Sequence, residues 1–222
     1  MAFYSEPMGR MAFGIYQLYR LLRQDRFRER RSRLFLESIR PTATTRILDV
    51  GGYACNWAYV PIASPITFLN TEYPDGWQVN DVRFTSETGN GCQMTFAGNS
   101  FDVAYSNSVI EHVGSYADQK HFAAEIRRVG KRVFLQTPNR WFFIEPHFLT
   151  VFVHYLPWPI AKHLVRVLSL RGLMRQGDNK DLKTLADELR LLTFGEMKEL
   201  FPDCVIHREK WFGLTKSFIA VR

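Results

Sequence analysis

Cysteine is scarce in this chain of 222 residues, and its few copies are badly placed for cross-linking. The three cysteines, Cys55, Cys92 and Cys204, form neither a disulfide framework nor a CxxC metal motif. We therefore expect no metal site and a reducing, cytoplasmic location. Residues 1–10 lack the apolar core of a secretory signal peptide, so no such signal is expected.

Long hydrophobic runs and repeats are also missing. The most apolar stretch, residues 142–170, is interrupted by charges, histidines and prolines, and never reaches the roughly 20 apolar residues of a membrane-spanning helix. No repeat or low-complexity linker divides the chain. Disorder is excluded because 46% of the residues are apolar and 14% are aromatic. We expect a single folded domain over residues 1–222.

Positive charge is concentrated near the N-terminus. The net charge is +7, and residues 20–40 contribute eight arginines against three acids, or +5 of that total. The rest of the chain is nearly neutral, so a nucleic-acid-binding protein is not indicated. Residues 11–40 are predicted to form a basic N-terminal helix, which Pro41 ends.

This basic helix has three interpretations. Its arginines could form a solvated face, a clamp over a ligand cleft, or a contact with an anionic membrane. The apolar stripe of the helix begins with Ile15, Leu18, Tyr19 and Leu22. We expect that stripe to cover the sheet, so a membrane anchor is not favoured. The charge attracts anions in every case, which favours an acidic ligand.

Short apolar runs alternate with helical patterns along the rest of the chain. Strands are predicted over residues 45–50, 65–70, 101–106 and 131–136. Ser115 is predicted to cap a helix over 116–129, and Thr193 with Glu196 to form a capping box. This alternation indicates an α/β fold, a three-layer sandwich with a mostly parallel sheet and helices on both faces.

The C-terminal residues follow another pattern. Two strand-like runs, 204–208 and 216–221, are joined through Trp211–Gly213. A link this short cannot hold a crossover helix, so the two strands are predicted to be antiparallel.

Ligands of an open parallel sheet bind at the carboxyl ends of its strands, so the residues found there are site candidates. Asp49, Gly51 and Gly52 follow the first strand; the two glycines allow close approach of a ligand, although a plain tight turn is an equal alternative. Asn70 and Glu72 lie 19 and 21 residues past Gly51, where either could bind ribose hydroxyls. The loop does not match the GxGxxG pattern of a dinucleotide site.

Several segments resemble the class I S-adenosylmethionine-dependent methyltransferases, in their type 11-like small-molecule group. Gly89–Val113 carries an SFDVAYSNSVIEHV string typical of that family, and Ile47–Gly51 is similar to its first cofactor motif. Glu125–Gly130 resembles the helix before the fifth strand, and Gly213–Ser217 resembles the closing antiparallel strand. The resemblance spans Arg46–Arg222.

The resemblance implies a Rossmann-like sheet of seven strands in the order 3-2-1-4-5-7-6, whose last strand is antiparallel. It also implies S-adenosylmethionine as cofactor and methyl transfer to a small-molecule acceptor. The cofactor-binding residues that it implies, together with the strand ends, are Asp49, Gly51, Gly52, Asn70, Glu72, Asn90, Gly91 and Asn107.

Four positions depart from the family pattern. Tyr53 and Cys55 replace loop glycines, while Asn70 and Asn90 replace acids that contact ribose and the adenine amino group. A neutral amide binds such donors more weakly than a carboxylate does. The alternative function is therefore a non-catalytic binding module that keeps the methyltransferase fold.

A subset of the family shares the double glycine, a tryptophan near Trp57 and the segment Thr137–His147, so the departures resemble a subfamily signature. Residues 141–190 are predicted to form an insertion that covers the substrate pocket; the alternative is an insertion that only thickens the core. The acceptor is expected to be anionic or partly apolar.

Two histidines are candidates for a general base, should the acceptor need to lose a proton. His112 follows the strand over 101–106, and His147 is the second choice. Imidazole has an ordinary pKa of about 6.5 and can accept a proton at neutral pH. The structural alternative is that Glu111 and His112 only hold the loop.

Overall fold

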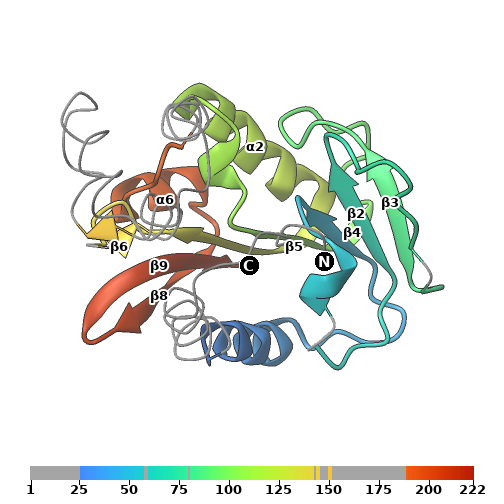
Figure 1. The fold of residues 1–222 in the computed structure, drawn as a ribbon, viewed down its shortest axis with the longest axis horizontal. Coiled ribbons are helices and arrows are strands. Elements are labelled where there is room, and N and C mark those ends of the chain that lie inside the picture. Colours follow the sequence, from blue (N-terminus) through green and yellow to red (C-terminus); the bar gives the residue numbers. More distant parts are fainter. Residues whose placement is uncertain (1–25, 58–59, 80, 143, 146–149, 152–188) are drawn as a thin grey trace, which may run out of the picture. The chain divides into compact units, whose positions relative to one another are not determined.

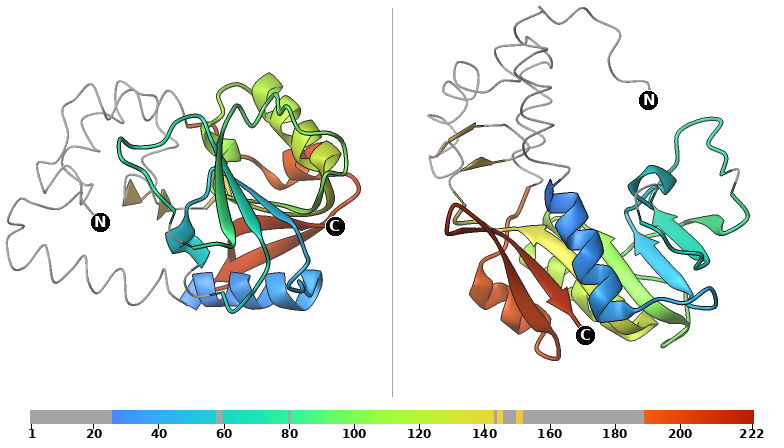
Figure 2. Two further views of the ribbon diagram at one scale, coloured as in Figure 1. Left: turned by 90° about the vertical axis from the view of Figure 1, so that its right-hand side faces the viewer. Right: turned by 90° about the horizontal axis from the view of Figure 1, so that it is seen from below.

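The computed structural model describes residues 26–57, 60–79, 81–142, 144–145, 150–151 and 189–222 (Figures 1 and 2). The chain divides into two units. The smaller unit comprises Met1–Ser32 and Phe143–Asp187, and it contains an antiparallel pair of short strands. These strands are β6 (Ile144–Glu145) and β7 (Thr150–Val151). The larger unit comprises Arg33–Phe142 and Glu188–Arg222.

The larger unit is built on a seven-stranded sheet (Figure 1). In sheet order its strands are β3 (Phe84–Thr88), β2 (Ile66–Asn70), β1 (Ile47–Val50), β4 (Phe101–Asn107), β5 (Gly130–Pro138), β9 (Leu214–Val221) and β8 (Val205–Trp211). The first five are parallel, and β9 is antiparallel to both β5 and β8. The predicted fold class and strand order are confirmed.

One face of the sheet is covered by α2 (Tyr116–Val129) and α6 (Phe194–Leu200). The predicted Ser115 cap and the predicted capping box of Thr193 with Glu196 are both present, and Ser115 also forms a capping box, with Asp118. Each box satisfies backbone N–H groups that have no partner inside the helix. The two helix starts are thus set by local sequence.

The other face is covered by residues 33–39, the C-terminal part of a helix over residues 26–39, which is the described part of the predicted basic helix. The ring of Phe35 packs edge-on against Trp57, Tyr105 and Phe134, with centroids 5.5, 5.5 and 5.3 Å away. Arg132 of β5 donates hydrogen bonds to the carbonyls of residues 38 and 39, which would otherwise be unpaired at the helix end. The apolar stripe predicted at residues 15–22 lies outside the described residues.

This helix lies where the connection between β1 and β2 leaves the sheet uncovered. The described part of that connection contains one 3-10 turn, η1 (Ala54–Trp57), and no α-helix. An N-terminal helix therefore completes the layer on this face, and the predicted three-layer arrangement is confirmed (Figure 2). Among the described helices, none is long and apolar enough to cross a membrane.

Sequence patterns missed the two short strands β6 and β7 and one strand of the seven-stranded sheet, β3. β3 has the sequence Phe-Thr-Ser-Glu-Thr, and only its first residue is apolar. It lies at the edge of the sheet, with partly or fully exposed side chains, so no buried run marks it. β8 extends to Trp211, and the hairpin turn is Phe212–Gly213. The expectation of a single domain over residues 1–222 stays a prediction.

Candidate active site

The carboxyl ends of β1, β2 and β4 meet at one edge of the sheet. Val50, the last residue of β1, is in register with Leu69 of β2 and Ser106 of β4. Beyond β1, the Gly51 N–H donates to the Leu69 carbonyl at 2.8 Å. The Ser106 hydroxyl donates to the Val50 carbonyl at 3.0 Å. The site candidates predicted after these strands therefore lie at adjacent strand ends.

Both residues of the double glycine are required by their surroundings. Gly51 has φ +78°, and a Cβ there would lie 2.4 Å from a methyl group of Val109. A Cβ on Gly52 would lie 1.8 Å from Asp49 Oδ2. A side chain at either position would displace its neighbour, which is more than a plain turn demands.

Asp49 is buried beneath this loop, with 1% of its surface exposed. The Trp57 indole N–H donates to its Oδ2 at 2.7 Å, whereas Oδ1 has no hydrogen-bond partner among the described residues. Burial raises the pKa of Asp49 to about 7, and the hydrogen bond from Trp57 offsets part of this rise. The loop thus encloses a carboxyl group with one unsatisfied oxygen.

Asn70 ties the end of β2 to the glycine loop. Its Nδ2 donates to the Gly52 carbonyl at 2.9 Å, which leaves Oδ1 as an acceptor. A carboxylate at this position could not make that bond, because it has no donor when ionised. The asparagine is therefore a clamp on the loop as well as a substitute for an acid. Glu72, two residues further on, is exposed.

Three aromatic residues form a cluster beside the loop. Tyr53 lies edge-on to Tyr73 and to Trp77, with ring centroids 6.2 and 5.2 Å apart, and Tyr73 stacks on Trp77 at 5.6 Å. The Tyr73 hydroxyl donates to the Phe68 carbonyl at 2.8 Å, and the Trp77 indole N–H to the Ser86 hydroxyl at 3.1 Å. Sequence reasoning missed this cluster; the tyrosine in place of a loop glycine was the available signal.

Asn90 and Gly91 lie in the loop after β3. Asn90 Oδ1 accepts a hydrogen bond from the Cys92 backbone N–H at 2.8 Å, and the side-chain N–H groups remain as donors. A Cβ on Gly91 would lie 2.6 Å from the Phe122 ring and 3.0 Å from a methyl of Val50. Packing against α2 accounts for this glycine, and its contact with a cofactor stays a prediction.

The segment after β4 holds the remaining candidates. Asn107 is the last residue of β4, and η2 (Ile110–His112) follows. Glu111 is fully buried: the Thr137 hydroxyl donates to its Oε2 at 3.0 Å, and its carbonyl accepts from the Arg190 N–H at 2.8 Å. Glu111 therefore holds the loop, as the structural alternative proposed, while the neighbouring His112 is exposed. His147 lies outside the described residues.

Within the described residues, no group of three His, Cys, Asp or Glu side chains could hold a metal ion. Residues 68–133, from β2 to β5, match a family model described as a methyltransferase domain. This match covers the SFDVAYSN string, and the sheet has the strand order that the resemblance implied. Residues 68–133, less than half of the chain, are thus similar to a methyltransferase domain. Among curated protein sequences, none matches this chain.

Several solved structures are similar to this chain in fold. A 1,6-didemethyltoxoflavin-N1-methyltransferase from Burkholderia thailandensis is similar with a TM-score of 0.55 and 13% identity, over 98% of this chain and 91% of that one. A phosphoethanolamine N-methyltransferase 2 from Haemonchus contortus has a TM-score of 0.50 and 15% identity, over 81% of this chain. The match spans only 39% of that enzyme.

A third similar structure carries a different description. A protein from Rhodobacter sphaeroides described as a Zn-dependent alcohol dehydrogenase has a TM-score of 0.51 and 12% identity, over 86% of this chain and 88% of that one. Identities this low establish the fold alone. The activity has to be argued from the residues of the site.

Proposed function

We propose that the protein binds S-adenosylmethionine and transfers its methyl group to a small-molecule acceptor. The observation that carries the proposal is Asp49, a buried carboxyl group with one unsatisfied oxygen beneath the glycine loop. Burying such a group is unfavourable unless a partner of complementary charge or a donor arrives. The cofactor carries an ammonium group, which is a partner of that kind.

The residues around the loop fit the other parts of this cofactor. Asn70 Oδ1 and the Glu72 carboxylate are acceptors, as ribose hydroxyls require. The Asn90 side-chain N–H groups and the aromatic cluster of Tyr53, Tyr73 and Trp77 suit the ring nitrogens and the face of a base. Asn107 and Gly91 complete the proposed set.

When bound, the cofactor supplies a methyl group already activated by its positively charged sulfur. The protein then has to orient the acceptor and keep water out. His112 is the proposed base if the acceptor must lose a proton, because it is exposed beyond the carboxyl end of β4. His147 remains the second choice from sequence.

The acceptor is proposed to be small, and anionic or partly apolar. The Burkholderia thailandensis protein was solved with 1,6-didemethyltoxoflavin, and the Haemonchus contortus protein with phosphomonomethylethanolamine. Both are small molecules, which supports that size class for this chain. Residues 141–190 are proposed to cover the acceptor. The three unpaired cysteines support a reducing, cytoplasmic location.

Calorimetry with S-adenosylmethionine and S-adenosylhomocysteine tests the proposal. We expect saturable binding of both, and a marked loss of binding in Gly51→Val, where the new side chain would meet Val109. No heat and no thermal shift at millimolar ligand would contradict cofactor binding. Binding without methyl transfer to any of a panel of small acceptors would favour the alternative, a non-catalytic module with this fold.

A further inference from the structure

The tip of the β8–β9 hairpin exposes large apolar side chains. Phe212 is 88% exposed and Leu214 is 54% exposed. Trp141, which is 64% exposed, belongs to the neighbouring segment: the Asn139 amide donates to the Thr215 carbonyl at 2.8 Å. Exposed apolar side chains that gather on one surface commonly mark a contact with another molecule.

The backbone conformation of the hairpin turn does not explain why a phenylalanine occupies position 212. Its φ is +47°, in the left-handed region, and the next residue, Gly213, has φ +81°. A two-residue hairpin turn with two positive φ angles favours Asn-Gly, because large side chains are strained there. Phe212 is thus neither packed in the core nor suited to its turn. Outliers of this kind motivate a functional hypothesis.

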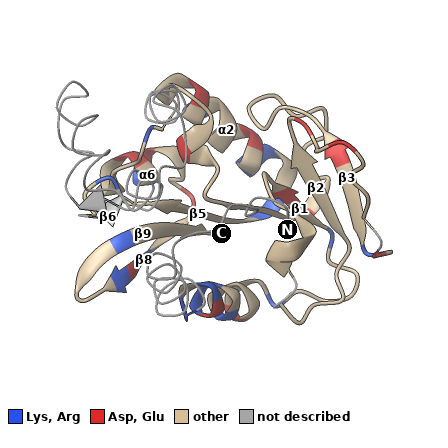
Figure 3. Ribbon diagram, in the orientation of Figure 1, with Lys and Arg blue, Asp and Glu red and all other residues tan. Residues whose placement is uncertain are grey.

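Among the described residues, the exposed charged side chains of the hairpin are all positive. Arg208 and Lys210 on β8, and Arg140 beside the hairpin, are exposed. Glu209 is the sole acid of β8 and β9; its side chain is 7% exposed and accepts a hydrogen bond from Ser217. Figure 3 shows the basic segments on both strands of the hairpin.

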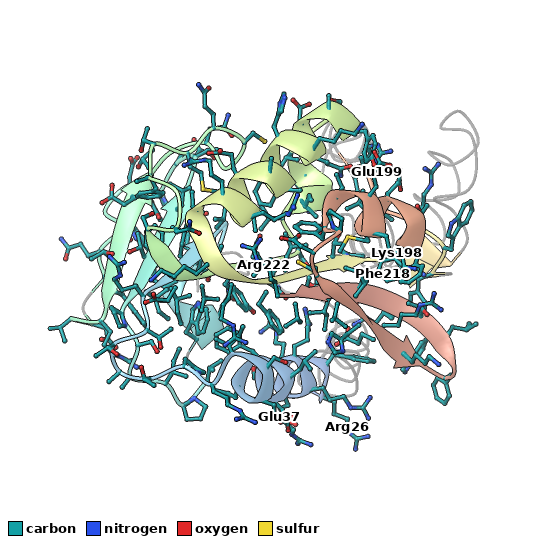
Figure 4. All side chains as sticks on the ribbon, turned by 180° about the vertical axis from the view of Figure 1, so that it is seen from behind. Arg26, Glu37, Lys198, Glu199, Phe218 and Arg222 are labelled. Atoms are coloured by element: carbon teal, nitrogen blue, oxygen red, sulfur yellow. The ribbon has the colours of Figure 1, made fainter. Side chains whose placement is uncertain are left out.

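Lys198 of α6 adds one exposed cationic side chain near the hairpin, on a helix that also carries Glu196 and Glu199. Arg208 and Lys198 both lie over the ring of Phe194, at 3.9 and 4.9 Å from its centroid. Figure 4 shows Lys198 on this helix, next to the hairpin strand that carries Phe218. The apolar tip is therefore flanked by at least three exposed cationic side chains.

We propose that this hairpin docks the protein on an anionic lipid surface, with Phe212 and Leu214 entering the interface. Aromatic and aliphatic side chains next to Lys and Arg match the boundary between acyl chains and anionic headgroups. A second copy of the chain fits less well, because two such surfaces would repel each other. A nucleic acid would match the charge but not the aliphatic side chain of Leu214.

The hairpin tip lies at the same edge of the sheet as the glycine loop. β9 is antiparallel to β5, and Ser217 pairs with Pro138 at the carboxyl end of β5. The tip therefore extends beyond the carboxyl ends of the parallel strands. Docking would turn this edge toward the bilayer, where amphiphilic molecules are concentrated. The proposal concerns binding alone and does not depend on methyl transfer.

Vesicle flotation of the full chain tests the proposal. We expect the protein to float with vesicles of phosphatidylcholine and phosphatidylglycerol, and much less with phosphatidylcholine alone. Phe212→Asn should lower the partition coefficient about tenfold, because it removes the ring that enters the lipid interface in the proposed bound state. The folded state should not suffer, since Asn tolerates positive φ. Lys210→Gln should lower the partition coefficient about threefold, and this effect should be smaller at high salt, which screens the charge.

Val82→Asn is the matched control. Val82 is fully exposed and lies between β2 and β3, away from the hairpin. This substitution also replaces an exposed apolar side chain by asparagine, and it should leave flotation unchanged. Failure to float with anionic vesicles, or equal flotation of Phe212→Asn, would overturn the proposal. A dimer that Phe212→Asn dissociates would assign the surface to a second copy instead.

Discussion

Replacing Asn70 by Asp distinguishes a loop clamp from a weakened ribose acceptor. The family resemblance places an acid at this position, so a simple acceptor role predicts that Asn70→Asp binds S-adenosylmethionine as well as or better than the wild type. The structure predicts the opposite. The Asn70 amide donates to the Gly52 carbonyl, and an ionised aspartate would place an oxygen against that carbonyl.

The expected loss is modest but measurable. A hydrogen bond contributes about 1 kcal/mol, and leaving the carbonyl facing a carboxylate adds a similar amount at this half-buried position. A loss of about 2 kcal/mol corresponds to a fall of about 4–8 °C in Tm for a chain of this size. If the loop is destabilised by this amount, the Kd of the cofactor should rise by roughly tenfold or more.

The effect of Asn70→Asp should depend on pH. Ionisation is unfavourable in the folded state, so the pKa of the new carboxyl lies above its unfolded value of about 3.9. The variant is therefore most impaired above its folded-state pKa, and the deficit disappears as pH falls below about 3.9. Differential scanning fluorimetry across this range gives the Tm of both proteins.

Asn56→Asp is the matched control. Asn56 is exposed in η1, in the same loop, and carries no hydrogen bond that the substitution would break apart from a weak contact with Cys55. It adds the same charge and should change Tm and cofactor binding little. Equal or tighter binding by Asn70→Asp, with an unchanged Tm, would refute the clamp.

Asp49→Asn should keep the hydrogen bond from Trp57 and remove the buried charge. The raised pKa of Asp49 makes the stability of the wild type fall between pH 3.8 and about 7, so the variant should have a higher Tm at pH 8, a smaller gain at pH 5 and none below pH 3.8. The difference has an upper limit of about 4 kcal/mol, and calorimetry should show that cofactor binding is lost; tight binding by this variant would contradict the proposed ammonium site. Gly51→Ala should lower Tm by more than Gly76→Ala, since both glycines have positive φ but only Gly51 faces a neighbour within 4 Å; equal losses would mean that the close approach of Val109 is unimportant. His112→Gln should reduce methyl transfer about 10²-fold or more with cofactor binding intact if it is the base, whereas a loss below about threefold in the same assay would leave orientation alone as its role.

Much of the fold could be predicted from local signals. The helix over 116–129 has the bounds expected from the Ser115 cap and the following glycine, because capping involves residues only a few positions apart. The antiparallel C-terminal hairpin followed from the length of its link. β3 could not be predicted, since an edge strand with mostly exposed residues has no buried run.

The sequence predicted where the residues of the candidate site lie in the sheet, but it did not predict which side chains contact one another there. The strand-end rule placed Asp49, Gly51 and Asn70 at one edge, and their register confirms that their strand ends are adjacent. The aromatic cluster was not foreseen, because Tyr53 and Trp77 are 24 residues apart and meet only when β1 and β2 pair. The hydrogen bond from the Trp57 indole to Asp49 was not foreseen either.

Apart from β3 and the short strands β6 and β7, the sequence by itself determined the order of the secondary structure. It also determined the mostly parallel sheet and the strand ends at which a ligand would bind. Periodicity, caps and short links depend on residues that are close in the sequence, so they can be recognised without knowing which distant residues pack against them. Only the tertiary structure decided which hydrogen bonds Asn70 and Asn90 make. An amide side chain carries both a donor and an acceptor, so its role depends on which one the folded chain uses. Gly52 takes the donor of Asn70 and Cys92 takes the acceptor of Asn90, which leaves opposite groups for a ligand.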